Sequence, residues 1–262
     1  MEQTETPLNT GYAEAGGHCI HFVECGRGEP LLLLHGAFGS GTDILQRDLG
    51  RKLAARYRVV APDSLGHGRS DAPVESGHYT AKRRAAHLAA VLDVLAIERA
   101  HIVGYSMGGW MASAFATYYP DRVATLAIGG WDVVGGMYTP AAIWGVAEIT
   151  GPHLIALARE VNPEIAAWVG KTEETSLASA IEGMNDLDGL AAGVARVPAP
   201  VAFWMGCDDL YYAASRKFAA SHGITFIDLP GDHIAAFEIH GASAGERIAD
   251  FIASAKRAGE MK

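Results

Sequence analysis

Short apolar runs that alternate with amphipathic stretches constrain the fold of this chain more than any other feature of its sequence. The first run, LLLLHG at 31–36, is a continuous apolar stretch cut off by glycine. Such a run is typical of a strand that is buried on both faces of a parallel sheet. Similar runs return further along the chain. They are YRVVAPD at 57–63, AHIVGY at 100–105, VATLAIGG at 123–130, PVAFWMG at 200–206 and ITFIDLPG at 224–231.

Helical spacing of apolar residues separates these runs. It predicts helices over about 43–56, from Thr80 onward, and over 107–119, where Pro120 stops the helix. Upstream of the first run, two short strands are expected to join near Gly16-Gly17. Because strands and helices alternate, the sequence predicts an α/β fold with a mostly parallel central sheet and helices on both of its faces.

The alternation lapses between the fourth and fifth buried runs, where the sequence shows only short helical pieces. One of them, NPEIAAWVG, has Asn162 as an expected N-cap, Pro163 in the first turn and Gly170 past the end. An insertion of roughly 65 residues is typical of a functional lid and not of a connector. The expected division is an α/β core of residues 1–130 and 197–262 and a helical lid of residues 131–196.

Composition excludes several classes of partner. The chain has 262 residues, is 49% hydrophobic and carries a net charge of −9. That charge disfavours nucleic acid and anionic membrane surfaces, and no apolar run reaches the roughly 18 residues that a membrane span needs. The polar start, MEQTETPLNT, lacks the pattern of a secretory signal. Three cysteines without metal-ligand spacing indicate reduced thiols. We therefore expect a cytoplasmic monomer or homodimer that acts on a small molecule.

The stretch GYSMG at 104–108 lies between a predicted strand and a predicted helix. In this context the G-x-S-x-G pattern indicates a strained turn that presents the Ser106 hydroxyl at the carboxyl ends of the strands. Gly104 and Gly108 keep Cβ atoms away where strand and helix pass closely. The Met107 amide is expected at the helix N-terminus, where free N–H groups favour negative charge. The pattern therefore predicts a nucleophilic serine.

A serine nucleophile needs a base, and the base needs an acid that orients it. Among the 11 histidines, His233 is the candidate base, because it follows a predicted strand in the loop PGDH just before the last helix. Asp209 lies three residues after Gly206, at the end of the preceding strand, and is the candidate acid. The adjoining Asp208 is the alternative acid.

These motifs resemble those of the α/β-hydrolase fold superfamily, and the resemblance covers almost the whole chain. HGAFGS, DSLGHGRSDAP, GYSMGG, the G-x-x-D of 206–209 and the late GDH occur in the order of that family. The chain is similar to an esterase or enol-lactonase-like branch with a small helical lid. The resemblance implies that Ser106 is the nucleophile, Asp209 the acid and His233 the base. It also implies an oxyanion hole made by the backbone N–H groups of Ala37 and Met107.

The same resemblance raises three further points. Some members of the family place the acid after the strand that follows the nucleophile helix. Asp132 stands there and is otherwise a lid hinge or a polar loop residue. His67, a second possible base, is implied to shape its loop. The family usually has glycine before the last histidine, whereas this chain has Asp232, which either raises the pKa of the base or is solvated.

The expected chemistry is acyl transfer through Ser106, without a metal or an organic cofactor. Dehalogenases and epoxide hydrolases of this fold use an aspartate at the elbow, so the serine disfavours both. The sequence predicts hydrolysis of a small to medium apolar carboxylic ester or lactone. A carbon–carbon bond hydrolase or lyase and a slow-turnover ligand receptor are the alternatives. Because the lid is apolar and aromatic, Phe38, Trp131 and Trp144 are expected to line the substrate pocket.

Overall fold

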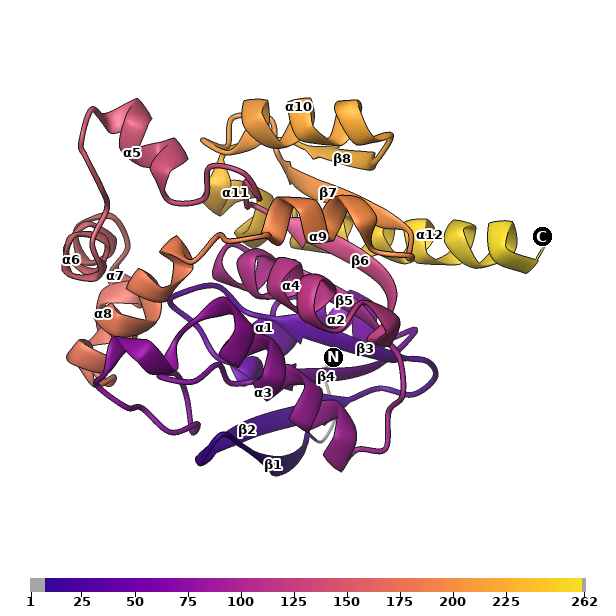
Figure 1. Cartoon of the computed structure of the whole chain (residues 1–262), viewed down its shortest axis with the longest axis horizontal. Coiled ribbons are helices and arrows are strands. Elements are labelled where there is room, and N and C mark those ends of the chain that lie inside the picture. The colour runs from indigo at the N-terminus through magenta and orange to yellow at the C-terminus, as the bar shows by residue number, and fades with distance from the viewer. Residues whose placement is uncertain (1–7, 261–262) are drawn as a thin grey trace, which may run out of the picture.

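The computed structural model describes residues 8–260, which form one eight-stranded sheet with the order β1-β2-β4-β3-β5-β6-β7-β8 (Figure 1). β1 and β2 pair antiparallel with each other and β2 pairs antiparallel with β4, whereas all further pairs are parallel. The predicted mostly parallel sheet is confirmed. Its strands are β1 Asn9–Ala15, β2 His18–Cys25, β3 Pro30–Leu34, β4 Arg58–Pro62, β5 Ala100–Tyr105, β6 Val123–Gly129, β7 Val201–Gly206 and β8 Thr225–Leu229.

The central strands are buried because helices cover both faces of the sheet. In β3, Leu32 and Leu34 belong to one apolar cluster, while Leu31 and Leu33 belong to the other. This follows from the two-residue period of a strand, which sends successive side chains to opposite faces. Both faces are apolar, so the run had to be apolar throughout.

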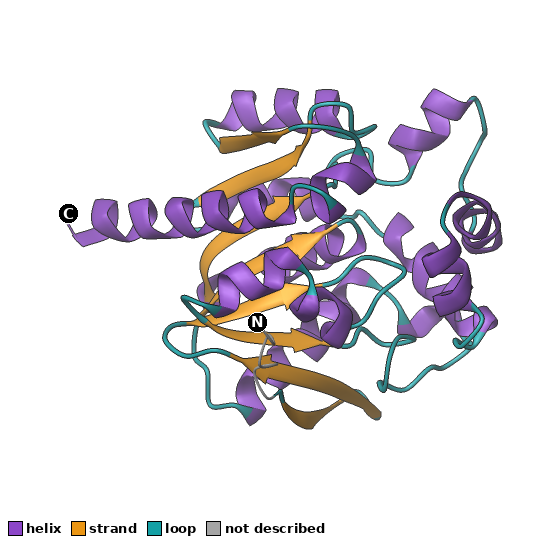
Figure 2. Ribbon diagram, turned by 180° about the vertical axis from the view of Figure 1, so that it is seen from behind, coloured by secondary structure: helices purple, strands orange, loops and turns teal. Residues whose placement is uncertain are grey.

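Two layers of helices flank the sheet (Figures 1 and 2). On one face the covering helices are α3 Ala81–Val94, α4 Met107–Tyr118, α9 Leu190–Arg196 and α10 Tyr212–His222. On the other face they are α1 Gly41–Gln46, α2 Asp48–Ala54, α11 His233–Glu238 and α12 Gly241–Glu260. No helix within residues 8–260 combines the length and the apolar character needed to cross a membrane.

The single helix predicted over about 43–56 is wrong, because the structure has two short helices there. Arg47 separates α1 from α2 with an extended backbone, φ −73° and ψ 162°. The chain folds back so tightly that a Cβ on Gly50 would lie 2.3 Å from the carbonyl oxygen of Ile44. The spacing of apolar residues indicates only which face of a helix is buried. Because α1 and α2 bury their apolar side chains against the same face of the sheet, the spacing does not show the break between them.

The segment between β6 and β7 is helical, as the sequence predicts. It contains α5 Tyr138–Trp144, α6 Gly151–Val161, α7 Pro163–Val169, α8 Glu174–Glu182 and α9. The Asn162 side chain caps α7 by accepting hydrogen bonds from the N–H groups of Glu164 and Ile165. Helices α5 to α8 stand beyond the carboxyl ends of the strands, whereas α9 packs along α4 (Figures 1 and 2). We therefore propose α5–α8 as the lid and assign α9 to the layer that covers the sheet.

Candidate active site

Ser106 forms a strained corner between the end of β5 and the start of α4. Its backbone has φ 57° and ψ −118°, a combination that costs a residue with a side chain about 1–3 kcal/mol. Its N–H donates to the carbonyl of Gly129 over 2.8 Å, and its own carbonyl accepts from the N–H groups of Gly109 and Trp110 at 2.8 and 3.1 Å. The neighbouring strand β6 and the first turn of α4 therefore hold the strained turn that the motif predicts.

The two glycines beside the serine are required by close backbone packing. A Cβ on Gly104 would lie 2.1 Å from the carbonyl oxygen of Gly108, and a Cβ on Gly108 would lie 2.1 Å from that of Leu34. Ordinary contacts of a Cβ begin near 3.4 Å, so neither position accepts a side chain without movement of the backbone. Leu34 ends β3 and Gly104 lies in β5, so two central strands and α4 meet at this corner.

His233 begins α11 and is paired with Asp209, which follows β7. The His233 Nδ1 and Asp209 Oδ2 atoms are 2.8 Å apart, and the Asp209 side chain is fully buried. The other carboxylate oxygen accepts the N–H of Tyr211 at 3.0 Å. Because a carboxylate only accepts, Nδ1 carries the shared proton and Nε2 of the neutral ring is left free to act as a base.

Gly129, the last residue of β6, and the following Gly130 lie between the imidazole and the serine corner. Gly130 has φ +54°, and a Cβ built on it would lie 2.9 Å from Cε1 of His233. The preceding residue, Gly129, accepts the hydrogen bond from the Ser106 N–H. The imidazole and the serine thus adjoin the same two-residue segment, at the carboxyl edge of the sheet. We therefore propose that Nε2 of His233 is the group that takes the proton of Ser106.

The two alternative acids lie in different surroundings from Asp209. Asp208 is exposed. Asp132 is buried, but its carboxylate accepts hydrogen bonds from the N–H groups of Val134 and Gly135 and from the hydroxyl of Thr139, at 2.6–3.0 Å. Asp132 therefore stabilises the turn that leads into the lid, which agrees with its interpretation as a lid hinge.

Asp232 has a role that the sequence interpretation did not give it. Its carboxylate caps α11, accepting the N–H groups of Ile234 and Ala235 at 3.0 and 2.8 Å. A helix N-cap satisfies backbone donors that have no intrahelical partner. The residue that replaces the usual glycine of the family thus fixes the start of the helix that carries His233.

We expect Asp232→Asn to keep kcat/KM close to that of the wild type, because asparagine caps helices as well as aspartate does. Asp232→Ala removes the cap and should lower the free energy of unfolding by about 1 kcal/mol. Ester hydrolysis and thermal unfolding of both variants test this. Loss of activity in Asp232→Asn with an intact fold would mean that Asp232, and not Asp209, partners the base.

A loop after β3 lies against the serine, since a Cβ on Gly36 would be 3.6 Å from Cβ of Ser106. His35 shapes this loop. Its Nε2 accepts the N–H of Ser64 at 3.0 Å, so Nδ1 carries the proton and donates to the carbonyl of Gly36 at 2.7 Å. Burial lowers the pKa of His35, which favours this neutral form. The Gly36 carbonyl and the Ala37 N–H belong to one trans peptide unit, so fixing the carbonyl also fixes the direction of the N–H.

The other predicted oxyanion donor, the Met107 N–H, opens α4, and N–H groups in a first helical turn have no intrahelical partner. His67 contacts the same loop through the carbonyl of Ala37, 2.9 Å from its Nε2, while its Nδ1 lies 3.2 Å from the carbonyl of Leu65. Burial lowers the pKa of His67 well below its usual range. His67 is therefore a loop-shaping residue, as the resemblance implies.

Two tyrosines hold the imidazole of His233, and the sequence interpretation gave neither a role. The Tyr105 hydroxyl donates to the carbonyl of His233, and the two ring centroids lie 5.0 Å apart. Tyr211 meets the imidazole edge-on at 5.8 Å, and burial raises the pKa of its hydroxyl. Tyr105 lies inside the G-x-S-x-G motif, and Tyr211 lies two residues after Asp209. This closeness to the candidate catalytic residues is the sequence feature from which a role for the two tyrosines could be inferred.

The expected pocket residues have different environments. Phe38, in the loop after β3, is half-buried and lies edge-on to Trp168 of α7 at 6.5 Å. Trp131 is completely buried against Tyr211, with ring centroids 5.5 Å apart. Trp144 is 46% exposed on α5. Trp131 thus packs in the core and Trp144 faces solvent, so Phe38 and Trp168 are better candidates for a pocket wall.

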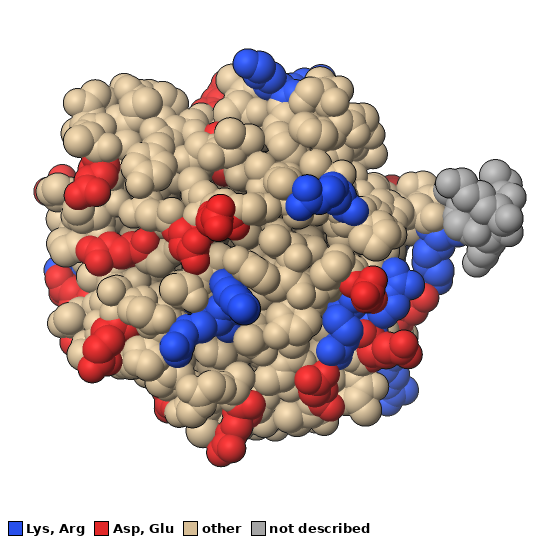
Figure 3. Space-filling model, in the orientation of Figure 1, with Lys and Arg blue, Asp and Glu red and all other residues tan. Residues whose placement is uncertain are grey.

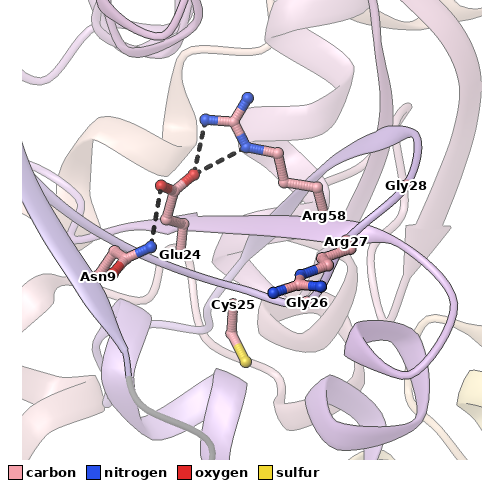
Figure 4. A pocket seen from close by; sticks show the side chains of 7 residues that line it. All are labelled: Asn9, Glu24, Cys25, Gly26, Arg27, Gly28 and Arg58. Atoms are coloured by element: carbon pink, nitrogen blue, oxygen red, sulfur yellow. Dashed lines mark hydrogen bonds and ion pairs between the residues drawn. The ribbon is translucent and has the colours of Figure 1, made fainter.

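Two of the hollows on the surface of the described residues lie at opposite ends of the parallel strands. The larger, of about 520 Å³, adjoins the ion pair of Glu24 and Arg58 (Figure 4). Arg58 opens β4, so this hollow is at the amino edge of the parallel strands, away from Ser106. The smaller, of about 280 Å³, is lined by His67 and Trp168. It therefore opens between the lid and the loop that follows β4.

Several known proteins have sequences similar to that of this chain. Residues 29–140 match a family model described as the alpha/beta hydrolase fold. A 2-hydroxy-6-oxononadienedioate/2-hydroxy-6-oxononatrienedioate hydrolase of Paraburkholderia phymatum is 40% identical over 163 residues, 59% of this chain and 56% of that protein. A cis-3-alkyl-4-alkyloxetan-2-one decarboxylase of Shewanella oneidensis is 31% identical over 175 residues, 65% of this chain and 54% of that protein. The chain thus spans about half the length of these curated relatives.

Solved structures match over nearly the whole chain. The enol-lactonase from Burkholderia xenovorans LB400 superimposes with a TM-score of 0.73 and 23% identity, covering 93% of this chain and all of that one. At that identity the likeness concerns the fold. The matched family model agrees with it over residues 29–140, and the chain therefore has the α/β-hydrolase fold.

Proposed function

We propose that this protein is a serine hydrolase that cleaves a small to medium apolar carboxylic ester or lactone through an acyl-enzyme intermediate. One observation carries the proposal above all others. A buried carboxylate, Asp209, orients His233 beside the strained corner that presents Ser106. Such an acid–base pair is needed because a serine hydroxyl is a weak nucleophile near neutral pH.

In the proposed cycle, Ser106 Oγ attacks the carbonyl carbon of the substrate while Nε2 of His233 takes the hydroxyl proton. Asp209 keeps the other proton on Nδ1 and stabilises the imidazolium that forms. The carbonyl oxygen becomes an oxyanion that accepts hydrogen bonds from the N–H groups of Ala37 and Met107. Each such donor contributes about 3–4 kcal/mol to transition-state stabilisation.

The tetrahedral intermediate collapses when the imidazolium gives its proton to the leaving alkoxide, which departs as an alcohol. In a lactone the alcohol stays attached to the acyl group. Water then attacks the ester of Ser106 while His233 takes a proton from it. The imidazolium returns this proton to Ser106 Oγ as the acyl–oxygen bond breaks, which releases the carboxylic acid and restores the free enzyme. Two tyrosine rings against the imidazole limit its rotation during both proton transfers.

Aromatic side chains of the lid and of the loop after β3 favour an apolar substrate. The surface of the lid is mostly uncharged at the upper left of Figure 3, but Tyr138, Ile143 and Trp144 of α5 are exposed to solvent there and form no pocket wall. Phe38 lies in the loop after β3, which also carries Ala37. Together with Trp168 of α7, it offers an aromatic wall for an acyl or aryl group. Apolar surface of this kind stabilises a bound apolar group by about 25 cal/mol per Å² removed from water.

Carbon–carbon bond hydrolysis is the second candidate, and the matched relatives favour it. The Paraburkholderia protein, like relatives from Pseudomonas putida and Escherichia coli, is named as a hydrolase of a 2-hydroxy-6-oxo acid. The same serine and histidine would then act on a ketone carbonyl whose leaving group is a carbanion and not an alkoxide. The sequence interpretation kept this reading as its alternative.

A substrate panel separates the two candidates. We expect the purified protein to hydrolyse p-nitrophenyl esters and lactones, with kcat/KM highest for short to medium acyl chains and falling for charged ones. Ser106→Ala measured in parallel gives the background rate. A kcat/KM for a 2-hydroxy-6-oxo dienoate that exceeds every ester and lactone value by 100-fold would replace the first candidate with the second. Background rates on all substrates would contradict both.

A further inference from the structure

Arg84 of α3 is a charged side chain enclosed in the core. It has no exposed surface. Its Nη1 donates to the carbonyl of Leu65 at 2.9 Å, and its guanidinium lies over the ring of Tyr79, 5.0 Å from the ring centroid. Its Nε and Nη2 atoms are buried without a hydrogen-bond partner among the described residues. Buried arginines are normally paired, so two unsatisfied donors require an explanation.

The charge of Arg84 also lacks a counter-ion. Burial lowers the pKa of Arg84 to about 10, so the guanidinium remains protonated at neutral pH. Within residues 8–260 no carboxylate pairs with it. The phenol of Tyr79 does not compensate it, because burial raises the pKa of that hydroxyl to about 12. An uncompensated buried cation is strongly unfavourable unless an anion accompanies it.

The histidines around Arg84 do not supply a negative charge. Burial lowers the pKa of His35, His67 and His87, and the charge of Arg84 lowers each of them further. All three are therefore neutral at pH 7, and the pKa of His87 falls to about 3. None of these three histidines therefore compensates the charge of Arg84.

His87 supplies a further unsatisfied atom on the same face of the helix. It follows Arg84 by three residues, a spacing that places side chains as neighbours on an α-helix. Its Nδ1 is buried and, among the described residues, has no hydrogen-bond partner. A neutral imidazole with its proton on Nδ1 is a donor at that atom. Three buried nitrogen atoms without a partner among the described residues, two on Arg84 and one on His87, thus lie one helical turn apart on α3.

We propose that Arg84 and His87 form a binding site for a small monovalent anion of halide size, with chloride as the physiological occupant. Arg84 Nε and Nη2 and His87 Nδ1 would donate to it, and its charge would neutralise the guanidinium. Water would satisfy the donors but leave the positive charge uncompensated. The site has no exposed surface at Arg84, which excludes a bulky carboxylate such as the substrate. The proposal is independent of the hydrolase activity.

Thermal unfolding of the full chain in sodium bromide, against sodium gluconate at equal ionic strength, tests the site, because gluconate is too large to enter it. We expect bromide to raise the Tm of the wild type by about 3 °C at ten times its Kd. Arg84→Met should be insensitive to bromide. It should match or exceed the wild-type Tm in gluconate, since it removes an unpaired buried charge. Lys82→Met, an exposed position on the same helix, should respond like the wild type.

Crystals of the wild type grown in bromide provide a second readout, which stands even if Arg84→Met does not fold. An anomalous peak within hydrogen-bond distance of Arg84 Nη2 and His87 Nδ1 is the expected result. Equal bromide sensitivity in the wild type and Arg84→Met would overturn the proposal. A wild-type Tm that does not change with bromide would also overturn it. The same holds for a density map that shows water and no anomalous peak between the two side chains.

Discussion

Ser106→Ala should lower kcat for ester hydrolysis by roughly 10⁴- to 10⁶-fold, as loss of the nucleophile does in serine hydrolases with this kind of triad. The substitution removes one hydroxyl from a half-buried corner and keeps the Cβ, so the backbone strain and the hydrogen bonds of the turn remain. The Tm should therefore stay within a few degrees of the wild-type value. Hydrolysis of p-nitrophenyl acetate and a thermal scan measure the two quantities.

Ser113 offers a matched control on the same helix. Its hydroxyl is buried and donates to the carbonyl of Gly109 inside α4, so Ser113→Ala removes a hydroxyl close to the corner without touching the nucleophile. We expect this variant to retain kcat within a few-fold. Activity near the wild-type level in Ser106→Ala, or an equal loss in both variants, would contradict the assignment of the nucleophile.

Asp209→Asn should lower kcat by about 10⁴-fold while leaving the fold intact. The reason is the tautomer of the imidazole. An asparagine that turns its NH₂ group toward Nδ1 stabilises the ring with its proton on Nε2, and that ring cannot accept the proton of Ser106. Asp208→Asn should behave like the wild type, because Asp208 is exposed and the paired carboxylate is that of Asp209.

Asp132→Asn tests which strand carries the catalytic acid, because Asp209 follows β7 and Asp132 follows β6. Since the Asp132 carboxylate accepts three hydrogen bonds in the turn before the lid, its replacement should lower the Tm more than it lowers kcat. An inactive Asp132→Asn together with an active Asp209→Asn would contradict the assignment of Asp209 as the acid. Asp132 would then have to be the residue that pairs with His233 during the reaction.

The sequence predicts well those features that local pattern and strand position determine together. Apolar runs identify the central strands, and Ser106, Asp209 and His233 each follow a strand. Because parallel strands end at one edge, side chains far apart in the chain meet there. The pairing of His233 with Asp209 follows from this rule. The glycine spacing around Ser106 likewise reflects a backbone contact that only glycine permits.

Other features depend on contacts that periodicity does not report. At Arg47 the backbone turns so that Gly50 of α2 packs against Ile44 of α1, while the apolar spacing continues across the break. Trp131 and Trp144 look alike in sequence, yet one is enclosed and the other is nearly half exposed. Asp232 carries a readable signal, since aspartate before a helix is a common N-cap, although its place beside His233 equally suggests an effect on the pKa of the base.

Arg84 is the clearest case of a feature that sequence reasoning does not reach. Its neighbours Lys82 and Arg83 are exposed, and charged residues on a surface helix are usually solvated. Only the packing of α3 against the sheet and the loop after β4 shows that this one cation is enclosed. The same packing shows that its charge is unpaired, from which the anion site is inferred.

Covalent labelling tests the central claim most directly, because it identifies the nucleophile without knowledge of the substrate. The wild type is treated with a fluorophosphonate, and intact-mass measurement and peptide mapping locate the adduct. The triad activates one serine, so we expect a single adduct on Ser106, little labelling of Asp209→Asn and none of Ser106→Ala. No adduct on the folded wild type, an adduct on another serine, or equal labelling of Ser106→Ala would contradict the proposed active site.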